Sequence, residues 1–464
     1  MYQINFEAPV KVHFIGIGGI SMSGLAEILL SRGFPVSGSD NRASALTEAL
    51  KEKGAVIQIG QRAGNITDDI GLVVYTAAIH ADNPERAEAE RRGLPMLTRA
   101  ELLGQIMKNY PDSVAVAGTH GKTTTTSMLT SILLSAELDP TISVGGILKE
   151  IGGNIRIGRS GYFVTEACEY TNSFLSFFPK IDIILNIEED HLDFFKDLDD
   201  IRHSFREFAC LVPDDGSIII NAGITDYQEI CKGAAGNIIT FSDDPEKQAD
   251  YSCFDITYDE HGCGSYVLLI RGKEAGRITL SVPGRHNVLN SLAAIAAAKT
   301  LGVSDDSISA GLKRFTGTDR RFEYKGSIGG VTVIDDYAHH PTEIRATLAA
   351  AENYPHNRLW CVFQPHTYSR TKSLFSEFVD ALSLADHVIL ADIYAAREQD
   401  TLGMSSQLLM EEINRKTGDD RARYFNSFDR IEAFLLAECT EGDLILTMGA
   451  GDIYKVGETI LGKN

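Results

Sequence analysis

At residues 117–124 the chain reads Ala-Gly-Thr-His-Gly-Lys-Thr-Thr, directly after the apolar run 114–117. Glycines let the backbone curl, so that its N–H groups face a phosphate at the N-terminus of the following helix. Lys122 then offers a point charge to the β- and γ-phosphates of a nucleotide, and the hydroxyl of Thr123 can ligate Mg²⁺. This order of strand, glycine loop and helix predicts a nucleoside triphosphate site in an α/β domain.

The loop departs from the strict phosphate-loop pattern, because Val116 stands where the first glycine is expected. The core G-x-x-G-K-T is intact. An incidental glycine turn before a threonine-rich helix is the alternative. We favour the phosphate loop, because four consecutive threonines are poor helix formers with no structural reason to follow Gly-Lys.

Two polar residues could complete a metal site near this loop. Glu166 follows the apolar run 162–165, and His191 follows the apolar run 181–187. Open α/β sheets bind ligands at the carboxyl ends of their strands, where both residues are expected. Mg²⁺ prefers oxygen ligands, so Glu166 is the simpler ligand, whereas His191 could be a base or a softer ligand. Taken alone, Glu166 is equally consistent with an exposed acid at the end of a strand, and His191 is better explained as a polar residue with its hydrogen bonds satisfied.

The N-terminal region carries a second glycine-rich turn. Residues 16–24 read GIGGISMSG after the apolar strand predicted at 12–17. A dinucleotide fingerprint would need glycine at position 21, which is Ser21. Asp40 closes the next predicted strand, where such folds often bind a ribose hydroxyl. The turn therefore favours a diphosphate site of another kind. Two phosphate sites suit an enzyme that uses ATP to join a nucleotide-carried substrate to a second molecule.

Polar clusters also follow two predicted strands near the C-terminus. Residues 335–344 read DDYAHHPTEI and residues 364–371 read QPHTYSRT, while Arg320 and Arg321 precede both. Such local positive charge in an acidic chain indicates an anionic ligand, either a carboxylate or a phosphate. The alternative is a set of helix caps and solvated loops, with an aspartate capping a helix that begins near Pro341.

Composition limits the class of protein. The chain has 464 residues, of which 44% are apolar, and its 43 basic and 64 acidic residues give a net charge of −21. Nucleic acid and anionic membranes are poor partners for such a chain. Seven cysteines without a C-x-x-C pair predict reduced thiols, and no apolar stretch is long enough to span a membrane. We expect a cytoplasmic protein built from about three α/β domains.

Taken in order, these segments resemble the Mur ligase family over essentially the whole chain. The resemblance rests on GIGGISMSGLAEIL (16–29), GSD (38–40), GTHGKTTTT (118–126), EACEYTNSFL (166–175), NIEEDHLD (186–193), GRHNVLNSLAA (284–294), DRRF (319–322), DDYAHHPTEI and QPHTYSRT. It implies an α/β fold of three domains. These would be an N-terminal Rossmann-like domain for the UDP substrate (1–106), a central P-loop ATPase-type domain with a mostly parallel sheet (107–319), and a C-terminal Rossmann-like domain for an amino acid (320–464).

The resemblance also implies a reaction in the synthesis of peptidoglycan precursors. The lactyl carboxylate of UDP-N-acetylmuramate would attack the γ-phosphate of ATP, and L-alanine would attack the resulting acyl phosphate. The products would be UDP-N-acetylmuramoyl-L-alanine, ADP and phosphate. Mg²⁺ would be the cofactor, Mn²⁺ could substitute for it, and the protein would be a monomer or homodimer that binds neither nucleic acid nor membrane.

Site residues follow from the same resemblance. Those expected to act in catalysis are Lys122, Glu166, His191 and Arg320. Those expected to bind ATP are Gly118, Thr119, His120, Gly121, Lys122, Thr123, Thr124, His286, Asn290 and Arg320. Those expected to hold the metal are Thr123, Glu166 and His191. Those expected at the UDP substrate are Gly18, Ser21, Met22, Ser23, Asp40, Thr76, Ala77 and Ala78. Those expected at the amino acid are Tyr337, His339, His366 and Arg370, with Arg370 on the carboxylate.

Two departures from the family pattern bear on the chemistry. Thr367 stands where some members have an arginine, which leaves Arg370 as the main carboxylate ligand. Several sister ligases use a carbamoylated lysine, but residues 197–231 contain no lysine, so we expect no carbamoylation here.

Three alternative functions explain the sequence motifs less well. A murein-peptide ligase would act on the same UDP sugar, but the turn GIGGISMSG favours the alanine reaction. A nicotinamide-dependent oxidoreductase would leave the phosphate loop unused. A non-catalytic P-loop regulator would leave the C-terminal polar clusters unexplained.

Overall fold

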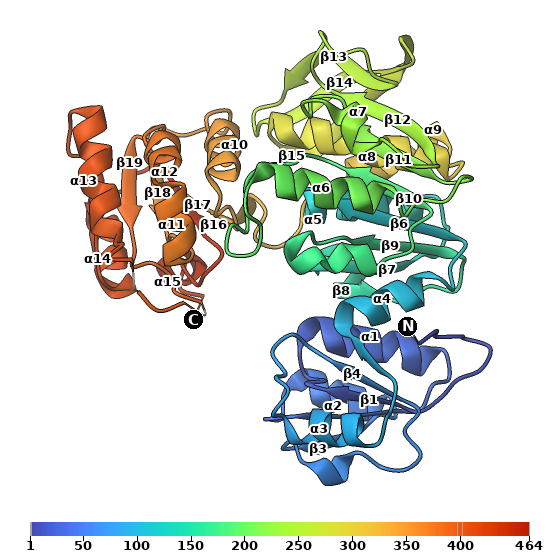
Figure 1. The fold of residues 1–464 in the computed structure, drawn as a ribbon. Coiled ribbons are helices and arrows are strands. Elements are labelled where there is room, and N and C mark those ends of the chain that lie inside the picture. Colours follow the sequence, from blue (N-terminus) through green and yellow to red (C-terminus); the bar gives the residue numbers. More distant parts are fainter. Residues whose placement is uncertain (1, 397, 401, 464) are drawn as a thin grey trace.

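The computed structural model describes residues 2–396, 398–400 and 402–463. The chain folds into three α/β units, each around its own sheet, which we name the N-terminal, central and C-terminal units. Figure 1 shows the N-terminal unit below the central unit and the C-terminal unit at its side. The three-domain α/β architecture expected from the sequence is confirmed.

The N-terminal unit has a parallel five-stranded sheet in the order β3-β2-β1-β4-β5. Its strands are β1 (Val12–Ile15), β2 (Val36–Asp40), β3 (Val56–Ile59), β4 (Leu72–Tyr75) and β5 (Met96–Thr98). Its helices are α1 (Ile20–Ser31), α2 (Ala45–Glu52), α3 (Pro84–Arg91) and α4 (Arg99–Met107), with a short 3₁₀ helix at Ala63–Asn65. Strand order reverses on either side of β1, and open α/β sheets bind ligands at the carboxyl ends of the strands at such a point.

The central unit has ten strands in the order β15-β14-β13-β12-β11-β10-β6-β9-β7-β8. They are β6 (Asp112–Ala117), β7 (Thr141–Leu148), β8 (Gly153–Arg156), β9 (Tyr162–Glu166), β10 (Ile181–Ile184), β11 (Ser217–Asn221), β12 (Asn237–Ser242), β13 (Tyr251–Tyr258), β14 (Cys263–Ile270) and β15 (Lys273–Pro283). The pairs β7–β8, β13–β14 and β14–β15 are antiparallel, and the other pairs are parallel.

Five α-helices belong to this unit, and β6, the strand that leads into the phosphate loop, lies between β10 and β9. They are α5 (Lys122–Ser135), α6 (Leu198–Ala209), α7 (Tyr227–Ile230), α8 (Arg285–Thr300) and α9 (Asp305–Arg314), with 3₁₀ helices at Lys149–Ile151 and Tyr170–Ser176. Helix α5 packs against α8 and α9, so its threonine-rich face is buried rather than solvated.

The C-terminal unit has a six-stranded sheet in the order β16-β17-β21-β18-β19-β20, parallel except for β16. Its strands are β16 (Glu323–Ile328), β17 (Val331–Asp336), β18 (Leu359–Phe363), β19 (His387–Leu390), β20 (Ala422–Tyr424) and β21 (Leu444–Met448). Its helices are α10 (Pro341–Ala351), α11 (Tyr368–Ser373), α12 (Phe375–Leu382), α13 (Ser406–Thr417), α14 (Phe428–Glu438) and α15 (Tyr454–Ile460). Figure 1 shows α10 on the side of this unit that faces the central unit.

The two unit boundaries are packed differently. One apolar core runs without interruption from the N-terminal unit into the central unit, through Leu103 and Ile106 of α4, Tyr110 and Phe163. The C-terminal unit has separate cores on the two faces of its sheet. It meets the central unit through polar side chains, described below, and such an interface is more easily opened than an apolar core.

Several element boundaries differ from the sequence prediction. The strand predicted at 12–17 is shorter, because β1 ends at Ile15. Glu166 is the last residue of β9 rather than the residue after it, and β10 ends at Ile184, so that His191 lies in a long loop. All seven cysteines are unpaired, as expected.

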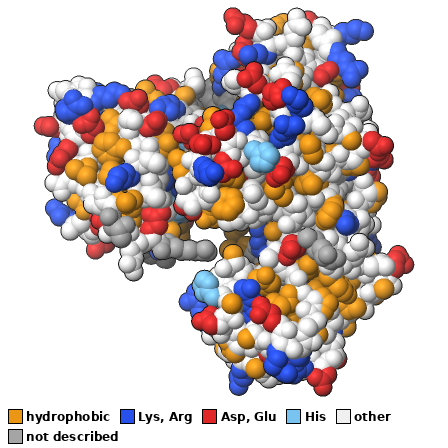
Figure 2. All heavy atoms as spheres, viewed as in Figure 1, with side chains coloured by type: hydrophobic (Ala, Val, Ile, Leu, Met, Phe, Trp, Pro, Cys, Tyr) orange, Lys and Arg blue, Asp and Glu red, His pale blue; other side chains and the backbone are white. Residues whose placement is uncertain are grey.

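Among the described residues no helix has the length and hydropathy needed to cross a bilayer. Figure 2 shows acidic, basic and apolar side chains interspersed over the face in view, and a hollow between the N-terminal and C-terminal units.

Candidate active site

The phosphate loop has the left-handed backbone that its glycines permit. Gly118 has φ +145° and Gly121, which precedes α5, has φ +84°. A Cβ at Gly118 would lie 2.9 Å from Cβ of Leu185, and one at Gly121 would lie 2.7 Å from Oδ1 of Asn290. A side chain at either glycine is therefore disfavoured by both strain and contact. Between the two glycines, the N–H groups of Thr119 and His120 donate to the carbonyl and the side chain of Asn186. The N–H groups of the first turn of α5 are therefore the ones that can face an anion.

Lys122 is held inside the loop by an acidic partner that sequence reasoning missed. Its Nζ donates to the carbonyl of Thr119 at 3.1 Å and lies 3.0 Å from Oε2 of Glu169. Burial alone would lower the pKa of Lys122, but the carboxylate of Glu169 raises it above its ordinary value. The lysine is thus charged and directed at the loop. The only sequence signal for Glu169 is its place three residues after Glu166.

Thr123 and Glu166 each lie beside one glycine of the pair Gly145–Gly146 in β7. Glu166 Oε1 accepts from the N–H of Gly145 at 2.5 Å, and a Cβ at Gly146 would lie 3.1 Å from Cγ2 of Thr123. His191 has φ +53° and stacks on Tyr170 with ring centres 4.5 Å apart. The set offers a hydroxyl and a carboxylate beside the phosphate loop. These oxygen donors fit Mg²⁺, and the imidazole of His191 is the softer member.

A cavity of about 460 Å³ opens beside the phosphate loop, between the central and C-terminal units. We call it the first cavity. His120, Gly121 and Thr124 line one side, and Arg321 and Glu343 line the other. Its size falls in the range of small-molecule sites.

The two residues predicted to hold adenine, His286 and Asn290, also line the first cavity. Burial lowers the pKa of His286 to about 4. The imidazole is therefore neutral at physiological pH and can both donate and accept a hydrogen bond, as adenine recognition requires.

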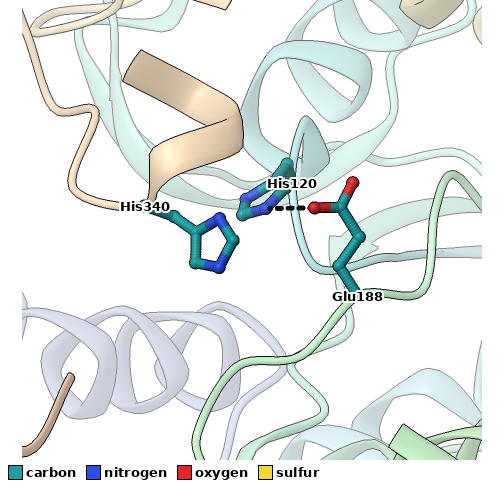
Figure 3. Close-up of side chains that lie close together, drawn as sticks. All are labelled: His120, Glu188 and His340. Atoms are coloured by element: carbon teal, nitrogen blue, oxygen red, sulfur yellow. Dashed lines mark ion pairs between the residues drawn. The ribbon is translucent and has the colours of Figure 1, made fainter. Parts of the chain in front are cut away.

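Three side chains from distant segments converge at the rim of the first cavity (Figure 3). His120 Nδ1 lies 3.2 Å from Oε1 of Glu343, and its Nε2 lies 3.6 Å from Oε2 of Glu188. Its ring packs on His340, with centres 4.7 Å apart. Burial alone would lower the pKa of His120, but the two carboxylates raise it to about 9. A charged His120 thus links the phosphate loop to α10 of the C-terminal unit.

Arg320, which the family resemblance places at the phosphates once the domains close, lies outside the first cavity in this structure. Its guanidinium binds Asp335 at 3.1 Å and two backbone carbonyls of its own unit, and it lies over the rings of Tyr337 and Tyr454. In this arrangement it does not reach the first cavity. The adjacent Arg321 lines that cavity instead. The local backbone decides which of these two neighbouring arginines faces the first cavity, and the sequence alone does not reveal it.

A second cavity of about 460 Å³ lies along the same boundary, between the 186–193 loop and α11. Arg370 Nη2 and Nε donate to Oδ1 of Asp190 at 2.7 and 3.1 Å, and Nη1 lies 3.1 Å from Nδ1 of His366. Burial alone would raise the pKa of Asp190, but Arg370 lowers it below its ordinary value. Burial lowers the pKa of His366 to about 4. The site therefore pairs one buried cation with one buried anion.

The other predicted amino-acid residues lie beside this ion pair. His339 packs edge-on against both His366 and Tyr337, with ring centres 5.8 and 5.5 Å away. Thr367 accepts from the N–H of Arg370 and so caps α11, with φ +65°, a strained value for a β-branched residue. The structure thus brings all four predicted residues together and gives Thr367 a positioning role.

The UDP-site residues of the N-terminal unit form a separate group. Asp40 Oδ2 accepts from the N–H of Gly18 at 2.9 Å, and Ser21 accepts from Arg99 at 3.2 Å. Met22 is buried in the apolar core, and Ser23 bonds the carbonyl of Ile20. Thr76 accepts from the N–H of Ala78 at 3.2 Å, and Ala77 lies in the same turn after β4. Arg99 is a cation that sequence reasoning missed.

Family models match each of the three units. The Mur ligase family catalytic domain matches residues 11–111, the Mur ligase middle domain matches 116–298, and the Mur ligase glutamate ligase domain matches 320–451.

Curated relatives match over the whole chain. The UDP-N-acetylmuramate–L-alanine ligase of Lachnospira eligens is 63% identical over 99% of this chain and 100% of its own length. The ligase of the same name from Agathobacter rectalis is 59% identical over the full length of both chains.

Solved structures agree. The UDP-N-acetylmuramate–alanine ligase of Thermotoga maritima superposes with a TM-score of 0.78 at 30% identity and 98% coverage of both chains. The murein peptide ligase of Psychrobacter arcticus superposes with a TM-score of 0.68 at 26% identity and the same coverage. None of these similarities supports an oxidoreductase. Three matched domains in order and whole-chain identity of this level leave one conclusion: the chain belongs to the Mur ligase family.

Proposed function

We propose that this protein is an ATP-dependent ligase that joins L-alanine to the lactyl carboxylate of UDP-N-acetylmuramate. One observation carries the proposal furthest: consecutive residues of one loop line both cavities. Asn186, Ile187 and Glu188 face the first cavity, and the next five residues face the second. A nucleotide in one and an amino acid in the other would approach each other along this loop. The names of the whole-chain relatives support the same reaction.

We divide the work among three domains, at residues 1–106, 107–319 and 320–464. The first would hold the UDP handle, the second ATP and the third the amino acid. The three family matches and the three sheets support this division. The cut at 106 falls near the end of α4, whose core is continuous with both neighbours, so the first two domains would move together.

The chemistry explains why a phosphate loop and an anion pocket are both needed. Condensing a carboxylate with an amine in water is uphill, so one carboxylate oxygen must leave as phosphate. The carboxylate attacks the γ-phosphorus and expels ADP. The ammonium group of the amino acid loses a proton, and the free amine then attacks the acyl carbon. The nitrogen gives up a second proton to water, and the C–O bond to phosphate breaks. Phosphoryl transfer requires neutralised charge and in-line positioning, which Lys122 and the N–H groups at the start of α5 would supply.

Mg²⁺ is the cofactor we propose, with Thr123, Glu166 and His191 as its protein ligands, directly or through water. The oxygen donors beside the loop support this choice. Bound there, the ion would neutralise phosphate charge. The chain's own residues orient the reactants: His286 and Asn290 would hold adenine.

At the amino acid we assign Tyr337, His339, His366 and Arg370. At the UDP sugar we assign the turn after β1, Asp40 and the turn after β4. We keep Arg320 as the arginine that would reach the phosphates when the domains close, and we add Arg321, which lines the first cavity in this structure. A monomer or homodimer in the cytoplasm remains our expectation.

Product analysis tests the function. Purified protein is incubated with ATP, Mg²⁺, UDP-N-acetylmuramate and, in turn, L-alanine, other amino acids, or the tripeptide used by murein-peptide ligases. Mass spectrometry should find UDP-N-acetylmuramoyl-L-alanine. A product with the tripeptide alone would identify the rival ligase, and no product with any acceptor would overturn the proposal.

A further inference from the structure

The ion pair between Asp190 and Arg370 lies inside a cavity rather than on the surface. Asp190 belongs to the central unit and Arg370 to the C-terminal unit, and their side chains are only 8% and 11% exposed. Both line the second cavity, together with Leu192, Leu374 and Ala396. A buried pair of this kind pays a large desolvation cost, so its retention in a cavity needs a reason beyond stability.

The carboxylate of Asp190 and the guanidinium of Arg370 each keep one atom that a ligand could bind. Arg370 uses Nε and Nη2 on a single oxygen, Oδ1, of Asp190. Oδ1 also accepts from the N–H of His191, whereas Oδ2 lies 3.8 Å from Nε2 of His191. Oδ2 is therefore free to accept a shorter hydrogen bond from a cation. Arg370 Nη1 points to neutral His366 and can turn to a carboxylate.

A free α-amino acid carries a carboxylate and an ammonium group on adjacent atoms. If it replaced only the carboxylate of Asp190 on Arg370, the buried Asp190 would be left without a cation. Leaving one member of a buried charge pair uncompensated is strongly unfavourable. If the zwitterion inserts between the two, Arg370 pairs with its carboxylate and Asp190 with its ammonium. Every charge then stays paired, and net charge does not change.

We propose that Asp190 is the ammonium-binding residue of the amino-acid site, so that alanine inserts into the Asp190–Arg370 ion pair as a zwitterion. The inference rests on the proposed function and deepens it. It makes Asp190 a specificity residue: the site selects molecules with both charges and rejects those with one. It also places the amine on the 186–193 loop, the side from which the activated carboxylate would arrive.

The test uses the full-length protein and two alanine analogues, propionate without the ammonium and ethylamine without the carboxylate. In the wild type, each should inhibit alanine ligation at least about 30-fold more weakly than alanine binds, the factor expected when one charge of a buried pair is lost. In Asp190→Asn, KM for alanine should rise by a similar factor with KM for ATP unchanged. The preference for alanine over propionate should fall at least about tenfold, because propionate no longer strands a charge.

The control variant Asp199→Asn removes one negative charge from the exposed first turn of α6 and should leave every constant unchanged. Asp190→Glu, which restores the charge, should recover part of the alanine affinity. An unchanged or lower alanine KM in Asp190→Asn would overturn the inference, since Asp190 would then be a bystander or a competitor for Arg370. Equal binding of propionate and alanine to the wild type would overturn it without any variant. Absence of ligation by the wild type would instead refute the proposed function.

Discussion

The basic side chains at the two cavities are each paired with a carboxylate of the protein. Lys122 carries its charge against Glu169, His120 against Glu343 and Glu188, and Arg370 against Asp190. Each cation contacts a carboxylate of the protein. The phosphate or carboxylate of a bound ligand would either take the place of that carboxylate or bind next to it. The ligand-free protein thus keeps its binding cations compensated and ordered.

Replacing Lys122 by alanine should lower turnover by roughly 10²-fold or more, because charge that develops on the transferring phosphate loses its fixed partner. Steady-state phosphate release measures this effect. Lys273→Ala, an exposed lysine of β15, is the matched control and should behave like the wild type. Wild-type turnover in Lys122→Ala would remove this lysine from the mechanism.

The sequence predicts charge-bearing residues better than it predicts their partners. Lys122, His339, His366 and Arg370 could be singled out because each stands at the end of a predicted strand. Their partners could not, because His120 and Glu343 are 223 positions apart and meet only when two units pack. Arg320 and Arg321 show the same limit, since neighbouring residues point in different directions according to the local backbone, and Arg320 has φ +60°.

At the scale of elements, close backbone approaches fix how the N-terminal and central units pack. Helix α4 touches the 3₁₀ helix at Tyr170–Ser176 through Gly104, where a Cβ would lie 1.9 Å from the carbonyl oxygen of Ser176. No rotamer relieves contact between a Cβ and a backbone atom. The same 3₁₀ helix begins with the tyrosine that stacks on His191, so this packing also supports the candidate metal site.

Gly104→Ala should therefore lower the free energy of unfolding by about 1–3 kcal/mol or more, as overpacking of a dense core does. Urea denaturation followed by fluorescence measures it. Gly64→Ala is the control, because a Cβ there meets nothing within 4 Å, and its effect should stay within about 0.5 kcal/mol. Equal stability of both variants would mean that α4 shifts freely against its neighbour.

Strand positions were largely predictable, because buried parallel strands appear as short apolar runs such as 359–363 and 444–448, which match β18 and β21. The ends of the strands near the candidate site were harder to predict from the sequence. The apolar run 181–187 continues past the end of β10, because Ile187 packs at the edge of the core without strand pairing. Apolar character reports burial, and it does not report where hydrogen bonding to the next strand stops.

For the whole molecule, a continuous core joins two units and polar contacts join the third. His120 contributes to the second boundary as a cation, faced by Glu343, Glu188 and the ring of His340. Its pKa is raised from 6.5 to about 9 in the folded protein. A raised pKa means that its stabilisation is complete below about pH 6.5 and is lost as pH rises through about 9.

The melting temperature of the ligand-free wild type should thus exceed that of His120→Gln by a constant margin from pH 6.5 down to the acid range in which Glu188 and Glu343 become protonated. The margin should shrink steadily between pH 6.5 and 9. Differential scanning calorimetry over this range, with an NMR titration of the imidazole, measures both quantities. A margin independent of pH, or an imidazole that titrates near 6.5, would show that the two carboxylates do not hold His120 charged.

In the proposed reaction, one nucleotide carries the substrate and a second nucleotide activates its carboxylate. Oxygen labelling tests this most directly. UDP-N-acetylmuramate carrying ¹⁸O in both oxygens of its lactyl carboxylate is turned over with ATP and L-alanine, and the released phosphate is analysed by mass. The account predicts one ¹⁸O atom in each phosphate and one in each new amide. Phosphate free of the label, with ATP still consumed, would contradict it.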